Sequence, residues 1–93
     1  MSVKELPLAD AEAQKIVKAL SSQTNLKILR LLSQEKLDIS TIAARLKISE
    51  PSISEGAKQL ENLNLIKTNY AAGKRGVRKV CKLTIEKLTL TFK

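Results

Sequence analysis

The chain is 93 residues long, which suits one compact domain, and 43% of its residues are hydrophobic. It has one Cys, no His and no stretch of about eighteen consecutive apolar residues, which excludes an internal disulfide and argues against a transmembrane helix and metal chemistry. Its 17 Lys and Arg against 9 Asp and Glu give a net charge of +8, which favours a polyanionic partner over a catalytic role. We expect an intracellular protein, cytoplasmic and nucleoid-associated, with no cofactor and no metal.

The positive charge is concentrated in the last third of the sequence. Residues 1–61 carry nine basic and eight acidic side chains, whereas residues 62–93 carry eight basic side chains and one acidic one, Glu86. When such a region binds nucleic acid, counterions condensed on the phosphates are released, which gives affinity that does not depend on the base sequence. Anionic lipid is usually engaged by a basic amphipathic helix, but this region alternates like a strand. The pattern therefore favours nucleic acid over a membrane.

The first part of the sequence predicts a short arm and two helices. Residues 1–8 look irregular and are expected to form a flexible arm. Asp10 can cap a helix over residues 11–20, in which the apolar side chains share one face. Ser21 and Ser22 interrupt that pattern and can start a second helix over residues 23–33, whose many aliphatic side chains predict a central, buried position.

Residues 39–63 predict a helix-turn-helix. Ser40 is expected to cap a short helix of about two turns, which is followed by a tight connection. Ser49 is expected to cap a longer helix over residues 50–63, where Pro51 is tolerated because N–H groups of the first turn have no helical partner. In this motif the second helix enters the major groove of DNA. Any two successive amphipathic helices could imitate the pattern, so it does not establish DNA binding alone.

The remaining sequence predicts a β-hairpin followed by one more strand. Residues 65–85 contain two strand-like stretches, and the loop between them, residues 71–76, holds two glycines. Residues 88–92 alternate apolar and polar side chains, which predicts a short C-terminal strand. Residues 1–93 are therefore expected to form one α+β domain of about four helices, a hairpin and a short strand.

The polar residues at the start and along the longer helix are the candidates for contacts with DNA, with Lys58 positioning the helix on a phosphate and the others reading bases. They are Ser49, Glu50, Ser52, Ser54, Glu55, Lys58 and Gln59. Hydroxyl and amide groups can bond several base edges, Glu55 can accept a hydrogen bond from a cytosine amino group, and Lys58 can contact a phosphate. The alternative is that they are ordinary solvated residues, with Glu50 complementing the helix dipole.

The hairpin tip carries the candidates for contacts with the DNA backbone. They are Lys74, Arg75, Arg78 and Lys79. Gly73 and Gly76 allow the loop to turn sharply, so the tip can reach phosphates or enter the minor groove. The alternative is a solvated hairpin without a partner.

Three other residues invite an interpretation. Gly56 inside a predicted helix indicates a close approach, either of DNA or of the second helix. Tyr70 is expected to pack over the sheet rather than to stack on a base. Cys81 is expected to be a small buried hydrophobe without redox chemistry.

Several segments resemble a known family. They are ALSSQTNLKILRLL at 19–32, ISTIA at 39–43, SEPSIS at 49–54 and LENLNLI at 60–66. Together they are similar to the ArsR-type winged-helix regulators over about three quarters of the chain. The run GKRGVRKV at 73–80 is more like archaeal members of the group, and winged-helix proteins of archaeal viruses and plasmids look similar.

The resemblance implies a winged helix-turn-helix fold and a dimeric transcription factor, often a repressor. The longer helix would lie in the major groove with the hairpin, the wing, alongside it. ArsR metal sensors carry a cysteine-containing box where this chain has Leu-Asp-Ile-Ser at 37–40, so metal sensing is not expected. The chain also lacks the long C-terminal helix of the usual dimer, so the last strand or the first helix would have to form the dimer contact.

We therefore expect a homodimer that binds double-stranded DNA at one site and regulates transcription. Two other functions fit the same sequence features. One is an architectural or plasmid-partition protein that coats DNA with little sequence specificity. The other is a winged helix that docks an acidic protein partner instead of DNA.

Overall fold

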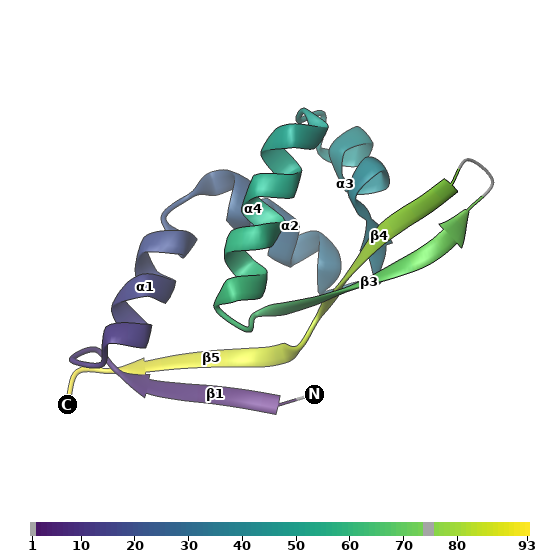
Figure 1. Cartoon of the computed structure of the whole chain (residues 1–93). Coiled ribbons are helices and arrows are strands. Elements are labelled where there is room, and N and C mark those ends of the chain that lie inside the picture. Colours follow the sequence, from purple (N-terminus) through teal and green to yellow (C-terminus); the bar gives the residue numbers. More distant parts are fainter. Residues whose placement is uncertain (1, 74–75) are drawn as a thin grey trace.

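The structure is a computed structural model that describes residues 2–73 and 76–93. Its elements are, in chain order, β1 (Ser2–Pro7), α1 (Ala11–Leu20), α2 (Gln23–Leu32), β2 (Leu37–Asp38), α3 (Ile39–Leu46), α4 (Glu50–Asn62), β3 (Ile66–Gly73), β4 (Gly76–Leu83) and β5 (Ile85–Thr91). Four helices therefore precede a hairpin and a last strand, as shown in Figure 1. This confirms the expected α+β winged helix-turn-helix fold.

Each helix begins where a polar side chain accepts a backbone N–H of the first turn. Asp10 caps α1 and Ser49 caps α4, as predicted, and Ser22, one of the two serines expected to start α2, is its cap, while Ser21 ends α1. The predicted Ser40 cap of α3 was wrong. Asp38 caps that helix by accepting the N–H of Thr41 at 3.2 Å, because buried Ile39 already begins the helix and leaves Ser40 inside its first turn.

The core is aliphatic and is built from all four helices and the base of the hairpin. Its most buried members include Ile16, Ile28, Ile42, Ile53, Leu60, Leu65 and Cys81. α4 packs against both α2 and α3, so the motif predicted from 39–63 is held on the rest of the domain. The nearly complete lack of aromatic residues is compensated by this interlocking of branched side chains.

The hairpin and its neighbour form an antiparallel sheet in the order β2-β4-β3. β3 and β4 pair along their whole length, from Ile66 opposite Leu83 to Gly73 opposite Gly76. Figure 1 shows this hairpin extending away from the helices beside α3, as a wing does. Lys74 and Arg75, two of the predicted DNA contacts, lie outside the described residues.

The structure corrects the expectation that residues 1–8 form a flexible arm. β1 runs parallel to β5 from Val3 opposite Lys87 to Pro7 opposite Thr91. Lys4 also forms an ion pair with Glu12 of α1 at 2.8 Å. The sequence does not reveal this pairing because the two strands lie at opposite ends of the chain. β5 also begins at Ile85, three residues earlier than the predicted strand.

Candidate nucleic-acid interface

α4 turns a continuous polar face away from the core. Its buried residues are Ile53, Gly56, Ala57 and Leu60, and the opposite side of the helix carries Pro51, Ser54, Glu55, Lys58 and Asn62. Four of these five exposed residues follow the spacing i, i+4, i+7, i+11 of one helix face. Ser54, Glu55 and Lys58 were predicted to contact DNA; Pro51 and Asn62 were not, although helical spacing places both on the same exposed face.

The start of α4 is bonded to α3 across the turn of the motif. Ser40 donates a hydrogen bond from its hydroxyl to Oε1 of Glu50 at 2.8 Å. Lys47 ends α3 in a left-handed conformation with φ 56°, which turns the chain sharply toward Ser49. Ser49 in turn donates to the hydroxyl of Ser52 at 2.9 Å. Glu50 therefore links the start of α4 to α3, while Ser49 is bonded within α4 itself, and the sequence did not indicate this link.

The inner flank of α4 is held by α2 through a buried amide. The side chain of Asn25, only 2% exposed, donates to Oε1 of Gln59 at 2.8 Å and to the carbonyl of Ala19 at 2.9 Å. Gln59 thus already accepts one hydrogen bond inside the protein, while its NH₂ donors have no printed partner within the described residues. A Cβ on Gly56 would lie 2.6 Å from Oδ1 of Asn25, so the close approach indicated by this glycine is that of the second helix.

The wing places two predicted contact residues on opposite faces. Lys79 shares a face with Cys81, which is fully buried under the helices, because residues two apart in a strand point the same way. Arg78 points to the other face, where its Nη1 lies 3.6 Å from Oδ2 of Asp38. Of these two residues, Lys79 therefore projects on the side of the hairpin that faces the helices.

Asp38 joins the wing to the helix-turn-helix. Its carboxylate caps α3 through Thr41 and also faces the guanidinium of Arg78. The hydrogen bond with Thr41, and then the positive charge of Arg78, lower the pKa of this carboxyl against the opposing effect of its burial. Sequence analysis missed this residue, although an Asp directly before a helical pattern is a recognised cap signal.

The distal wing exposes apolar side chains on the face of Lys79. Tyr70, directly opposite Lys79, is 74% exposed, and Val77 is 72% exposed. The expectation that Tyr70 packs over the sheet was wrong, because β3 has already left the core at this point. Cys81 is buried as expected, and desolvation raises its pKa to about 11.

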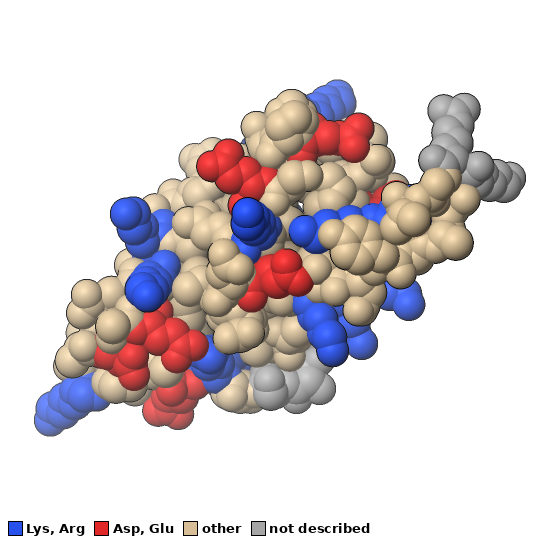
Figure 2. Space-filling model, in the orientation of Figure 1, with Lys and Arg blue, Asp and Glu red and all other residues tan. Residues whose placement is uncertain are grey.

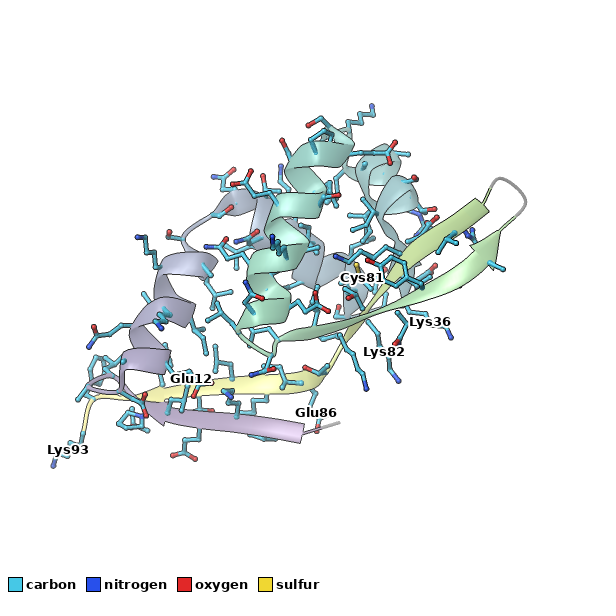
Figure 3. All side chains as sticks on the ribbon, viewed as in Figure 1. Glu12, Lys36, Cys81, Lys82, Glu86 and Lys93 are labelled. Carbon is cyan, nitrogen blue, oxygen red and sulfur yellow. The ribbon has the colours of Figure 1, made fainter. Side chains whose placement is uncertain are left out.

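The face of the molecule drawn in Figure 2 carries both basic and acidic side chains. Figure 2 shows Lys and Arg side chains across the middle of the face and at the base of the wing, with acidic groups between them. Figure 3 shows the side chains of α4 projecting into solvent over the same region.

Within residues 2–73 and 76–93, no group of three or more Cys, Asp or Glu could hold a metal ion. No helix in this part of the chain has the length and hydropathy needed to cross a membrane.

The sequence matches one family. The profile of the bacterial regulatory proteins of the arsR family matches residues 22–68, which is just over half of the chain. This segment runs from the cap of α2 through α3 and α4 into β3. A comparison with curated proteins finds no match.

Several solved structures share the fold. Reduced HlyU from Vibrio cholerae has a TM-score of 0.69 at 24% identity, with 80% of this chain and 74% of that chain covered. A homodimeric winged helix-turn-helix DNA-binding domain from Mycobacterium bovis has a TM-score of 0.66 at 22% identity, with 77% and 63% covered. A double mutant of ZitR from Lactococcus lactis has a TM-score of 0.60 at 31% identity, with 68% and 42% covered.

Proposed function

Because the chain belongs to the arsR family of bacterial regulatory proteins, we propose that it is a sequence-specific regulator that binds double-stranded DNA as a dimeric repressor. It would act in the cytoplasm on the nucleoid, by occupying a promoter rather than by catalysis. The observation that carries the proposal is the exposed face of α4, which stands free beside a basic hairpin while the rest of the motif is bonded internally.

Different residues of α4 would contact different parts of the DNA. Ser54, Glu55 and Lys58 have no internal hydrogen bond or ion pair in the described part of the chain, so they are available to a base edge or a phosphate. Glu55 can accept from a cytosine amino group and disfavours DNA that lacks one, while Lys58 supplies a phosphate contact. Ser52, Gln59 and Asn62 extend the same surface toward either side of the groove.

The wing supplies contacts that do not depend on sequence. Lys79, together with Lys74 and Arg75 at the tip, would contact phosphates or the minor groove beside the recognition helix. Arg78 faces Asp38 instead, so its contribution to binding would be through the position of the wing. Exposed Tyr70 provides an apolar surface beside Lys79 for a sugar or a base edge.

A dimer fits this function because one chain offers a single recognition helix. Two copies related by a two-fold axis would place their α4 helices about one turn of DNA apart and match a palindromic site. The Mycobacterium bovis domain with this fold is homodimeric. This supports the same assembly for the present chain.

Footprinting tests the proposal across the gene's own promoter and random DNA, at two salt concentrations. We expect a short symmetric footprint at one site that persists at the higher salt, and its loss in the Glu55→Ala variant. Protection that spreads along any DNA and disappears with salt would instead indicate an architectural or partition protein. No protection at either salt would leave the docking of a protein partner as the function.

A further inference from the structure

The side of the wing that is turned away from the helices carries a row of three lysines. Lys67 of β3 lies directly opposite Lys82 of β4. On the other side of β4, Leu37 of β2 pairs with Cys81. Lys36, one residue before β2, therefore lies beside Lys82 and completes the row. Figure 3 shows Lys36 and Lys82 pointing away from α4. We call these three residues the outer lysine row.

The outer lysine row places like charges side by side on one face of a sheet. Side chains directly opposite each other in an antiparallel pair have Cβ atoms about 4.5–5.5 Å apart, and like charges at these positions destabilise the pair. All three lysines are exposed, and none of them forms an ion pair within the described residues. A polyanion that lies across the three strands would remove this repulsion.

The acidic residue nearest to the row is already engaged. A cleft of about 530 Å³ runs along this side of the wing, and Asp38 is the acid among the described residues that line it. Its Oδ1 accepts the N–H of Thr41, and its Oδ2 lies 3.6 Å from Nη1 of Arg78. Because Asp38 is only 9% exposed, its carboxylate has little access to other partners. The outer lysine row therefore keeps its positive charge.

We infer that the outer lysine row binds the phosphates of a second DNA segment, so that the protein holds two duplex segments together. The inference rests on the DNA binding of the proposed function and adds a second surface to it. The row crosses three neighbouring strands that are about 4.8 Å apart, so it is about 10 Å long. Exposed lysines spread over that length suit successive phosphates of a nucleic-acid backbone better than one small anion.

This second segment differs from the one on α4 because the wing sheet stands between them. Lys79, the wing residue proposed to bind beside α4, projects on the side that faces the helices. The row lies on the opposite side and near the base of the wing, since Lys67 is six residues, or about 20 Å, from Gly73 at the end of the strand. Figure 2 shows basic side chains gathered below the hairpin in this view, away from α4.

Capture of one duplex by another tests the inference. A biotinylated duplex on streptavidin beads and a free fluorescent duplex are mixed with the protein at low salt. The row variant carries Lys36→Gln, Lys67→Gln and Lys82→Gln. The matched control carries the same change at three exposed lysines of α1 and α2, as Lys15→Gln, Lys18→Gln and Lys27→Gln. We expect the wild type and the control to retain the free duplex, and the row variant to retain at least about tenfold less of it.

Fluorescence anisotropy with a single duplex separates this inference from the proposed function. The row variant and the control should bind one duplex with equal affinity, and the row variant should fold because the change to Gln removes the repulsion between its lysines. A wild type that binds one duplex but captures no second one would overturn the inference and leave the proposed function intact. Equal capture by the two variants would also overturn it. Capture that inorganic phosphate abolishes at constant ionic strength would assign the row to a small anion instead. Failure to bind any duplex would refute both proposals.

Discussion

The carboxylate of Asp38 lies 3.6 Å from the guanidinium of Arg78, so the residue that caps α3 also contacts the distal part of the wing. The same carboxylate caps α3 through the N–H of Thr41. One short side chain thus links the helix-turn-helix to the hairpin.

Removal of the Asp38 link should separate its two roles. Asp38→Asn keeps a capping oxygen and loses the charge, so we expect a loss of less than about 1 kcal/mol in the free energy of unfolding. Asp38→Ala also loses the cap and should cost about 1–2 kcal/mol. Urea unfolding measures both values. Equal losses in the two variants would show that the charge, and not the cap, stabilises this site.

The same carboxyl predicts a dependence of stability on acid. Its pKa in the folded protein is lower than the ordinary value of 3.8, so its contribution is complete above that value and is lost as the pH falls through the lower, folded pKa. The difference in unfolding free energy between wild type and Asp38→Asn should therefore be constant near neutrality and shrink below about pH 4. Urea titrations at a series of pH values check this, and a difference that grows on acidification would contradict it.

Gly56 should not tolerate a side chain. A Cβ there would lie 2.6 Å from Oδ1 of Asn25, whose amide is already fixed by two hydrogen bonds, and 3.1 Å from Cδ1 of Ile28. We expect Gly56→Ala to lose about 1–3 kcal/mol of stability, despite the better helix propensity of Ala. Ser54→Ala, an exposed change in the same helix, is the control and should be nearly neutral. A stabilised Gly56→Ala protein would show that α2 can move away.

Lys58 should affect DNA binding through charge alone. Lys58→Ala removes one phosphate contact, so the slope of log K against log salt should become about 0.9 less steep on all sequences. Lys15→Ala is the control, because Lys15 is an exposed cation on α1, away from the α4 face. Fluorescence anisotropy with specific and random duplexes measures both. An effect confined to one sequence would instead make Lys58 a base-reading residue.

The thiol of Cys81 should react only when the protein opens. It is fully buried, and desolvation raises its pKa to about 11, so almost no thiolate is present at pH 8. An aromatic disulfide reagent should therefore modify the native protein far more slowly than the protein in urea. Rapid modification of the native protein would indicate that the base of the wing opens frequently.

Local signals in the sequence determined most of the helical part of this protein. Asp10, Ser22 and Ser49 mark helix starts because a cap needs only a few neighbouring residues, and the alternation in 65–85 marks the hairpin for the same reason. The exposed face of α4 follows from helical spacing alone.

Only the tertiary structure decided the contacts between elements distant in sequence. It paired β1 with β5, bonded Gln59 to Asn25, and set Arg78 and Lys79 on opposite faces of the wing. No local pattern contains these relationships, because each depends on how two segments meet after the chain has folded. The assignment of residues to DNA is limited in the same way, since a polar side chain in the sequence is free for a partner only if the fold has not already used it.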